Sequence, residues 1–103
     1  MRNYIFYEDG AHGWLRVDRD ELIELNIQAK ITGYSYQKDD FVYLEEDQDL
    51  TTFCKAKFLN DMDSARRWFQ SIPVKYSNYS NIRYYSSYDP KLLETPSYKL
   101  REV

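Results

Sequence analysis

The sequence predicts an α+β domain: a small antiparallel sheet of four to six short strands packed against one long (or kinked) helix and one short helix. Two patterns lead to this class. Short runs rich in aromatic and β-branched residues, which favour strands, are separated by polar turn segments. Between residues 50 and 72, apolar residues recur at intervals of three or four, as on one face of a helix. We assign residues 1–88 to one domain and residues 89–103 to a C-terminal tail with one helical turn.

A β-hairpin is predicted at the start of the chain, from residues 4–7 and residues 14–17. Both runs are aromatic or β-branched, and the residues between them are mostly polar or glycine. Gly10 or Gly13 is expected to supply the positive φ that a tight turn needs. The second run alternates between apolar and polar or aromatic residues, so its odd-numbered and even-numbered side chains face opposite sides of the sheet.

A short helix and a second pair of strands are predicted next. The helix covers about residues 20–26, and Asp18 or Asp20 is suited to cap its N-terminus. Residues 31–36 and 41–44 are interpreted as strands, because both are rich in aromatic and β-branched side chains. A polar connection between them has a normal length for a hairpin.

The apolar stripe predicts a helix from about residue 49 to residue 71. Its phase continues across Asp61, which favours one continuous or kinked helix, although Asp61 or Asp63 is equally suited to cap a second helix. Two short strands, over residues 74–76 and 82–85, are predicted to follow. The expected core consists of Leu15 or Trp14, Val17, Leu22, Ile23, Ile31, Val42, Leu44, Leu50, Phe53, Cys54, Phe58, Ala65 and Phe69.

Composition excludes several classes of protein. The 43% of hydrophobic residues is too high for a disordered chain, and no apolar run approaches the roughly 20 residues of a membrane span. The single cysteine, Cys54, leaves no internal disulfide, and no apolar leader resembles a signal peptide. We therefore expect a cytoplasmic protein with no membrane partner, either a monomer or a homodimer.

Residues suited to catalysis are sparse, and we expect neither an enzyme nor a cofactor. The only histidine, His12, falls in a turn, and Cys54 falls on the apolar helix stripe, where a buried thiol is inert. No nucleophile elbow and no glycine-rich phosphate loop occurs. A small metal-dependent enzyme built on the carboxylates Glu45, Glu46 and Asp47 is the remaining catalytic alternative.

Tyrosine with arginine is the most informative combination in the chain, which contains 11 tyrosines. Such side chains make hot spots in protein interfaces, and on a sheet they also stack on unpaired bases. The structural alternative is that they fill the open face of a thin sheet. The residues predicted to bind a partner are Tyr34, Tyr36, Tyr76, Tyr79, Arg83, Tyr84, Tyr85, Glu45, Glu46 and Asp47.

Charge is unevenly distributed along the chain. Residues 1–49 hold twelve acidic and five basic side chains, a net charge of −7, whereas residues 50–103 hold nine basic and five acidic ones, a net charge of +4. A small fold often neutralises such a dipole internally. Otherwise it presents an acidic or basic face to a partner.

Four segments resemble one family: residues 12–17 (HGWLRV), 31–36 (ITGYSY), 43–47 (YLEED) and 80–85 (SNIRYY). Together they are similar to small uncharacterised proteins encoded by phages, prophages and plasmids. The resemblance implies a mobile genetic element, whose small acidic proteins often bind and block host proteins. We therefore expect a non-enzymatic binding protein that inhibits a host defence protein, as an anti-CRISPR or anti-restriction factor does. A single-stranded nucleic-acid-binding module with a Tyr/Arg face is the alternative.

Overall fold

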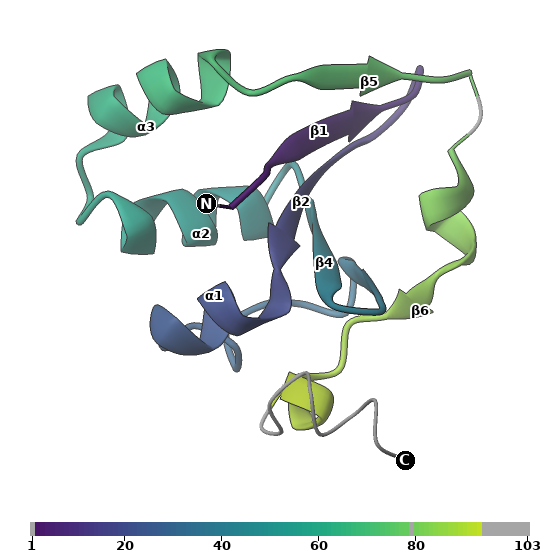
Figure 1. Ribbon diagram of the computed structural model, residues 1–103, viewed down its shortest axis with the longest axis horizontal. Helices are drawn as coiled ribbons and strands as arrows, with labels where there is room; N and C mark the ends of the chain where they lie inside the picture. Colours follow the sequence, from purple (N-terminus) through teal and green to yellow (C-terminus); the bar gives the residue numbers. More distant parts are fainter. Residues whose placement is uncertain (1, 79, 94–103) are drawn as a thin grey trace.

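The computed structural model describes residues 2–78 and 80–93, which form a six-stranded sheet with helices (Figure 1). The strand order is β5-β1-β2-β4-β3-β6. The strands are β1 (Ile5–Glu8), β2 (Gly13–Asp18), β3 (Tyr36–Lys38), β4 (Phe41–Glu45), β5 (Val74–Tyr76) and β6 (Ser86–Ser87). The helices are α1 (Arg19–Glu24), α2 (Asp49–Lys57) and α3 (Met62–Gln70), with short 3₁₀ helices η1 (Asn81–Tyr84) and η2 (Pro90–Leu93). The predicted α+β class is confirmed.

One face of the sheet packs against the three α-helices (Figure 1). Alternation along β2 and β4 turns Leu15, Val17, Val42 and Leu44 toward this side, where all four are fully buried. Phe53 of α2 fills the space between sheet and helices. Most of the predicted core is confirmed, although three of its members are only partly buried: Ile23, Phe58 and Phe69.

The opposite face of the sheet is aromatic and is partly covered by η1 and Tyr85, which follows it (Figure 1). Its buried centre consists of Trp14 of β2, Tyr43 of β4 and Ile82 of η1. Partly buried around this centre are Tyr7, Tyr36, Phe41 and Tyr85. Trp14 and Leu15 are thus both core residues, on opposite faces. Several tyrosines therefore cover the open face of the sheet, which was the structural alternative for the tyrosine excess.

The continuous helix over residues 49–71 was the wrong choice between the two alternatives. Leu59 and Asn60 have φ values of 51° and 68°, in the left-handed region, so α2 ends before them. Asp61 then caps α3, accepting a hydrogen bond from the Ser64 backbone N–H at 3.1 Å. The second alternative, a new helix capped by Asp61, is confirmed.

Two predicted strands are also wrong. Residues 31–35 form turns and only Tyr36–Lys38 is a strand, because the Asp49 side chain holds Thr32 and Ser35 in a non-extended loop. Residues 82–85 belong largely to η1. Ser80 caps the N-terminus of this helix, because its hydroxyl oxygen accepts a hydrogen bond from the Ile82 N–H.

Two smaller expectations, one for the edge of the sheet and one for the turns, are wrong. The sheet is mixed rather than antiparallel, since β5 runs parallel to β1; three other strands and the three α-helices lie between them in the chain. Among the described glycines none has a positive φ. In the turn between β1 and β2, the Asp9 carboxylate accepts hydrogen bonds from the N–H groups of Ala11 and His12, and a positive φ of 55° occurs at Asp39 in the turn between β3 and β4.

A partly buried ionic contact joins α1 and α2 to the residue that precedes β1. Glu21 of α1 accepts hydrogen bonds from the Tyr4 hydroxyl at 2.7 Å and from the Lys57 ammonium of α2 at 2.8 Å. The Lys57 ammonium also lies 5.6 Å from the centre of the Trp68 ring. Within the described residues, no helix is long and apolar enough to cross a membrane.

Candidate functional site: an aromatic hollow

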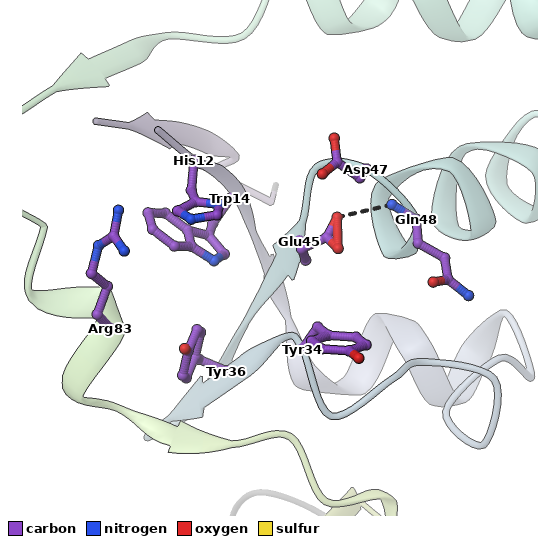
Figure 2. A pocket seen from close by; sticks show the side chains of 8 residues that line it. All are labelled: His12, Trp14, Tyr34, Tyr36, Glu45, Asp47, Gln48 and Arg83. Atoms are coloured by element: carbon purple, nitrogen blue, oxygen red, sulfur yellow. Dashed lines mark hydrogen bonds between the residues drawn. The ribbon is translucent and has the colours of Figure 1, made fainter. Parts of the chain in front are cut away.

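An open cavity lies at the end of the sheet, where the aromatic face meets the start of α2. It has a volume of about 550 Å³, within the range of ligand sites. We call it the aromatic hollow. Its lining residues are His12, Trp14, Tyr34, Tyr36, Glu45, Asp47, Gln48 and Arg83 (Figure 2).

Strand register determines the floor of the aromatic hollow. Trp14 of β2 lies directly opposite Glu45 of β4, and both side chains are on the aromatic face. Tyr36 of β3 meets Trp14 edge-on, with 6.4 Å between ring centres. Trp14 is only 3% exposed and forms a rigid floor, whereas Tyr34 is 72% exposed and stands at the rim.

A buried carboxylate positions one wall of the hollow. Asp49, the first residue of α2, accepts hydrogen bonds from the Thr32 backbone N–H (3.1 Å), the Thr32 hydroxyl (2.7 Å) and the Ser35 hydroxyl (2.6 Å). The Ser35 oxygen in turn accepts a hydrogen bond from the Glu45 N–H at 2.9 Å. One hydrogen-bond network therefore holds both the loop that carries Tyr34 and the backbone of Glu45.

A second carboxylate positions the other wall. Asp9 accepts two hydrogen bonds from Arg83, at 2.7 and 3.1 Å, and two more from the backbone N–H groups of Ala11 and His12. The hydrogen bonds from Ala11, Arg83 and His12 lower the pKa of Asp9 to about 2. The Arg83 guanidinium lies 5.6 Å from the centre of the Trp14 ring. Figure 2 shows Arg83 at the opposite end of the hollow from Glu45 and Asp47.

Negative charge dominates the side of the hollow near α2. Glu45 and Asp47 line it, and Glu46 and Glu8 lie close by. Within residues 2–78 and 80–93, none of these four carboxylates forms an ion pair. Burial, and then the charges of Asp47, Glu8 and Glu45, raise the pKa of Glu46. Arg83, by contrast, already has Asp9 as its counter-ion.

Five of the ten residues predicted to bind a partner meet in this hollow: Tyr34, Tyr36, Glu45, Asp47 and Arg83. The other described ones lie elsewhere. Tyr76 and Tyr85 border a smaller hollow of about 280 Å³, and Tyr84 borders a third. Glu46 lies beside Gly13. A Cβ atom, if residue 13 had one, would be 3.2 Å from the Glu46 carboxylate. Tyr79 lies outside the described residues.

Three lining residues were not predicted: His12, Trp14 and Gln48. Trp14 had one usable signal, because it alternates with the buried Leu15 and Val17 and so had to face the other side of the sheet. His12 lies against it, with 5.9 Å between ring centres. Gln48 lines the hollow next to Glu45, whose carboxylate accepts a hydrogen bond from the Gln48 backbone N–H at 2.9 Å.

The lining supplies few groups for chemistry. It contains one imidazole and two carboxylates, but no serine, cysteine or lysine nucleophile. Cys54 is buried on the helical face of the sheet, where burial raises the pKa of its thiol. Among the described residues, no three histidine, cysteine, aspartate or glutamate side chains are grouped closely enough to hold a metal ion.

Comparison with known proteins adds no relative. No protein-family model, no curated protein and no solved structure matches the chain. The resemblance to mobile-element proteins therefore stays a prediction.

Proposed function

We propose that the protein is a non-enzymatic binding protein that engages a partner protein through the aromatic hollow. The observation that carries the proposal is an open cavity in which strand register holds the rings of Trp14 and Tyr36, while the Asp49 network holds the backbone that carries Tyr34. Rigid aromatic side chains around a concave surface contribute most of the affinity in many protein interfaces. Ordering them before binding reduces the entropic cost of association.

A protein partner fits this cavity better than a nucleic acid does. Glu45 and Asp47 would repel the phosphates of a strand whose bases stacked on Trp14 or Tyr34. The one guanidinium in the lining, Arg83, is already paired with Asp9. The expected Tyr/Arg surface for single-stranded nucleic acid is also divided, because Tyr76, Tyr84 and Arg83 border three different hollows.

The partner that we propose is a host protein, and the proposed outcome is inhibition of a defence protein. This narrower part rests on the resemblance to proteins of phages, prophages and plasmids. A blocking protein needs a rigid contact surface and no catalytic group, which agrees with the lining of the hollow.

Affinity capture from host cells tests the proposal, with two tyrosine variants compared. Tyr34→Ala removes a ring from the rim of the hollow, and Tyr76→Ala removes a similarly exposed ring on β5. We expect the wild type and Tyr76→Ala to retain one stoichiometric partner, and Tyr34→Ala to lose most of it. Retention by Tyr34→Ala with loss by Tyr76→Ala would place the interface elsewhere.

A salt titration with fluorescent single-stranded DNA and RNA separates the two kinds of partner. We expect no binding at low ionic strength. Micromolar binding that weakens steeply with added salt would favour the nucleic-acid alternative, because such a slope reports the release of counter-ions from phosphates.

A further inference from the structure

We propose that the aromatic hollow receives a cationic side chain, an arginine or a lysine, which the partner protein inserts between the rings and the carboxylates. This inference rests on the proposed function and names the chemistry that the hollow recognises. It is carried by three features of the described residues: the arrangement of the rings, the balance of charge, and the position of the carboxylates.

The rings supply an electron-rich surface. Trp14 forms the floor, Tyr36 meets it edge-on, and Tyr34 stands at the rim with most of its surface free (Figure 2). The faces of such rings attract a guanidinium or an ammonium group, and the ring most open to an incoming one is that of Tyr34, because Trp14 is nearly buried. The protein already makes this contact once, because the Arg83 guanidinium lies 5.6 Å from the centre of the Trp14 ring.

The balance of charge favours a cation on the side of the hollow away from Arg83. Arg83 is neutralised by Asp9, which accepts two hydrogen bonds from it. Glu45 and Asp47 have no counter-ion among the described residues, and Glu46 adds to the same potential. The N-terminus of α2 opposes a cation with about half a positive charge, which is smaller than the charge of either carboxylate.

The position of the carboxylates supplies direction. Glu45 lies opposite Trp14 in the strand ladder, and its carboxylate already accepts one hydrogen bond, from the Gln48 N–H. A carboxylate has about four acceptor sites, so Glu45 retains capacity for an incoming N–H donor. A side chain that lies along the rings would bring its charged end to Glu45 and Asp47, where an ion pair with hydrogen bonds forms.

The probe for the test is N-acetyl-arginine amide, whose only charge is the guanidinium, and N-acetyl-citrulline amide is its neutral counterpart. The indole N–H signals of the two tryptophans are followed by NMR. Trp14 reports the hollow, whereas Trp68 packs against Tyr4 and Phe58 on the helical side and serves as an internal reference. We expect the arginine compound to shift the Trp14 signal with a Kd of about 1–10 mM, and the Trp68 signal to stay in place.

The neutral compound and added salt show whether charge is responsible. The citrulline compound should bind about fivefold or more weakly, and 0.5 M NaCl should weaken the arginine compound. Equal binding of the two compounds would overturn the inference, and so would a shift of Trp68 alone or of neither indole.

Charge variants extend the test to the captured partner. The double variant Glu45→Gln, Asp47→Asn keeps the shape of the lining and removes two charges, and Asp63→Asn on the exposed surface of α3 is the matched control. We expect the double variant to bind the arginine compound and the partner at least about fivefold more weakly, and the control to behave as the wild type.

The same variants separate failure of this inference from failure of the proposed function. If Tyr34→Ala loses the partner while the charge variant binds it normally, the hollow is the interface but a cationic side chain is not its ligand. If neither variant affects the partner, the proposed function at this hollow is wrong as well.

Discussion

At the scale of single residues, two buried aspartates organise the candidate site. Asp49 fixes the loop that carries Tyr34, and Asp9 fixes both the hairpin turn that carries His12 and the side chain of Arg83. Asp49 accepts hydrogen bonds from Thr32 and Ser35 of an earlier loop, and Asp9 accepts them from its own turn and from the distant Arg83. They position the lining of the aromatic hollow without lining it.

Removal of the Asp49 carboxylate should destabilise the whole fold. Asp49→Ala leaves the hydroxyls of Thr32 and Ser35 without their acceptor in a buried place, so we expect the free energy of unfolding to fall by about 2–4 kcal/mol. Urea titration measures the change. Asp63→Ala on the surface should change stability by less than about 0.5 kcal/mol, and an equally small effect of Asp49→Ala would contradict the network.

Acid should weaken the contribution of Asp9. The pKa of this carboxyl is about 2 in the folded protein, below the 3.8 of an unperturbed aspartate, so Asp9 binds protons more weakly when the chain is folded. Its stabilising effect is therefore complete above the unfolded value and is lost as the pH falls from about 4 to about 2.

The variant Asp9→Asn makes this effect measurable. The difference in unfolding free energy between wild type and Asp9→Asn should be constant above about pH 5 and should shrink toward pH 2. Arg83→Gln should make the dependence on pH shallower, because one cause of the low pKa is removed. A difference that did not vary with pH would contradict the assigned pKa.

At the scale of elements, the connection between α2 and α3 has an unusual backbone. Leu59 is 87% exposed and has a left-handed φ of 51°, a conformation that costs an ordinary side chain energy and costs glycine nothing. The apolar stripe keeps a helical phase across Leu59 and Asn60, so the spacing of apolar residues did not indicate the interruption.

Glycine at position 59 should stabilise the protein. Leu59→Gly removes no buried surface and relieves the left-handed backbone, so we expect a gain of about 0.5–1 kcal/mol in thermal or urea unfolding. Asn60→Gly should gain less, because asparagine tolerates this region well. A loss of stability in Leu59→Gly would mean that its side chain makes a contact that the exposed position does not suggest.

Local patterns predicted the elements that local chemistry determines. The strands at residues 4–7, 14–17, 41–44 and 74–76 were predicted because their side chains favour extended backbone. Residues 31–35 have a similar composition but are not a strand, because Asp49 of α2 binds Thr32 and Ser35. No local pattern in the sequence contains that tertiary contact.

In the candidate site, too, some residues follow from local sequence patterns and others only from tertiary contacts. Tyr34 and Tyr36 were found from the tyrosine excess, and Glu45 and Asp47 from the acidic run. Trp14 was missed because only the register between β2 and β4 places it opposite Glu45. Composition therefore named five residues that line one hollow, and strand pairing decided which of the ten predicted residues meet.

At the scale of the whole molecule, folding neutralises part of the charge dipole of the sequence. Basic residues of the second half pair with acidic residues of the first, as in Lys57 with Glu21 and Arg83 with Asp9. The acidic run beside the aromatic hollow has no such ion pair among the described residues. Negative charge is thus concentrated beside the exposed rings, which is where we place the partner.

Amide hydrogen exchange of the protein, alone and bound to its captured partner, tests this placement most directly. The account predicts slower exchange on binding in the loops that border the hollow, residues 32–36 and 45–48, and unchanged exchange in the α2–α3 connection at residues 58–61. Slower exchange confined to residues 58–61, with the hollow unaffected, would contradict it.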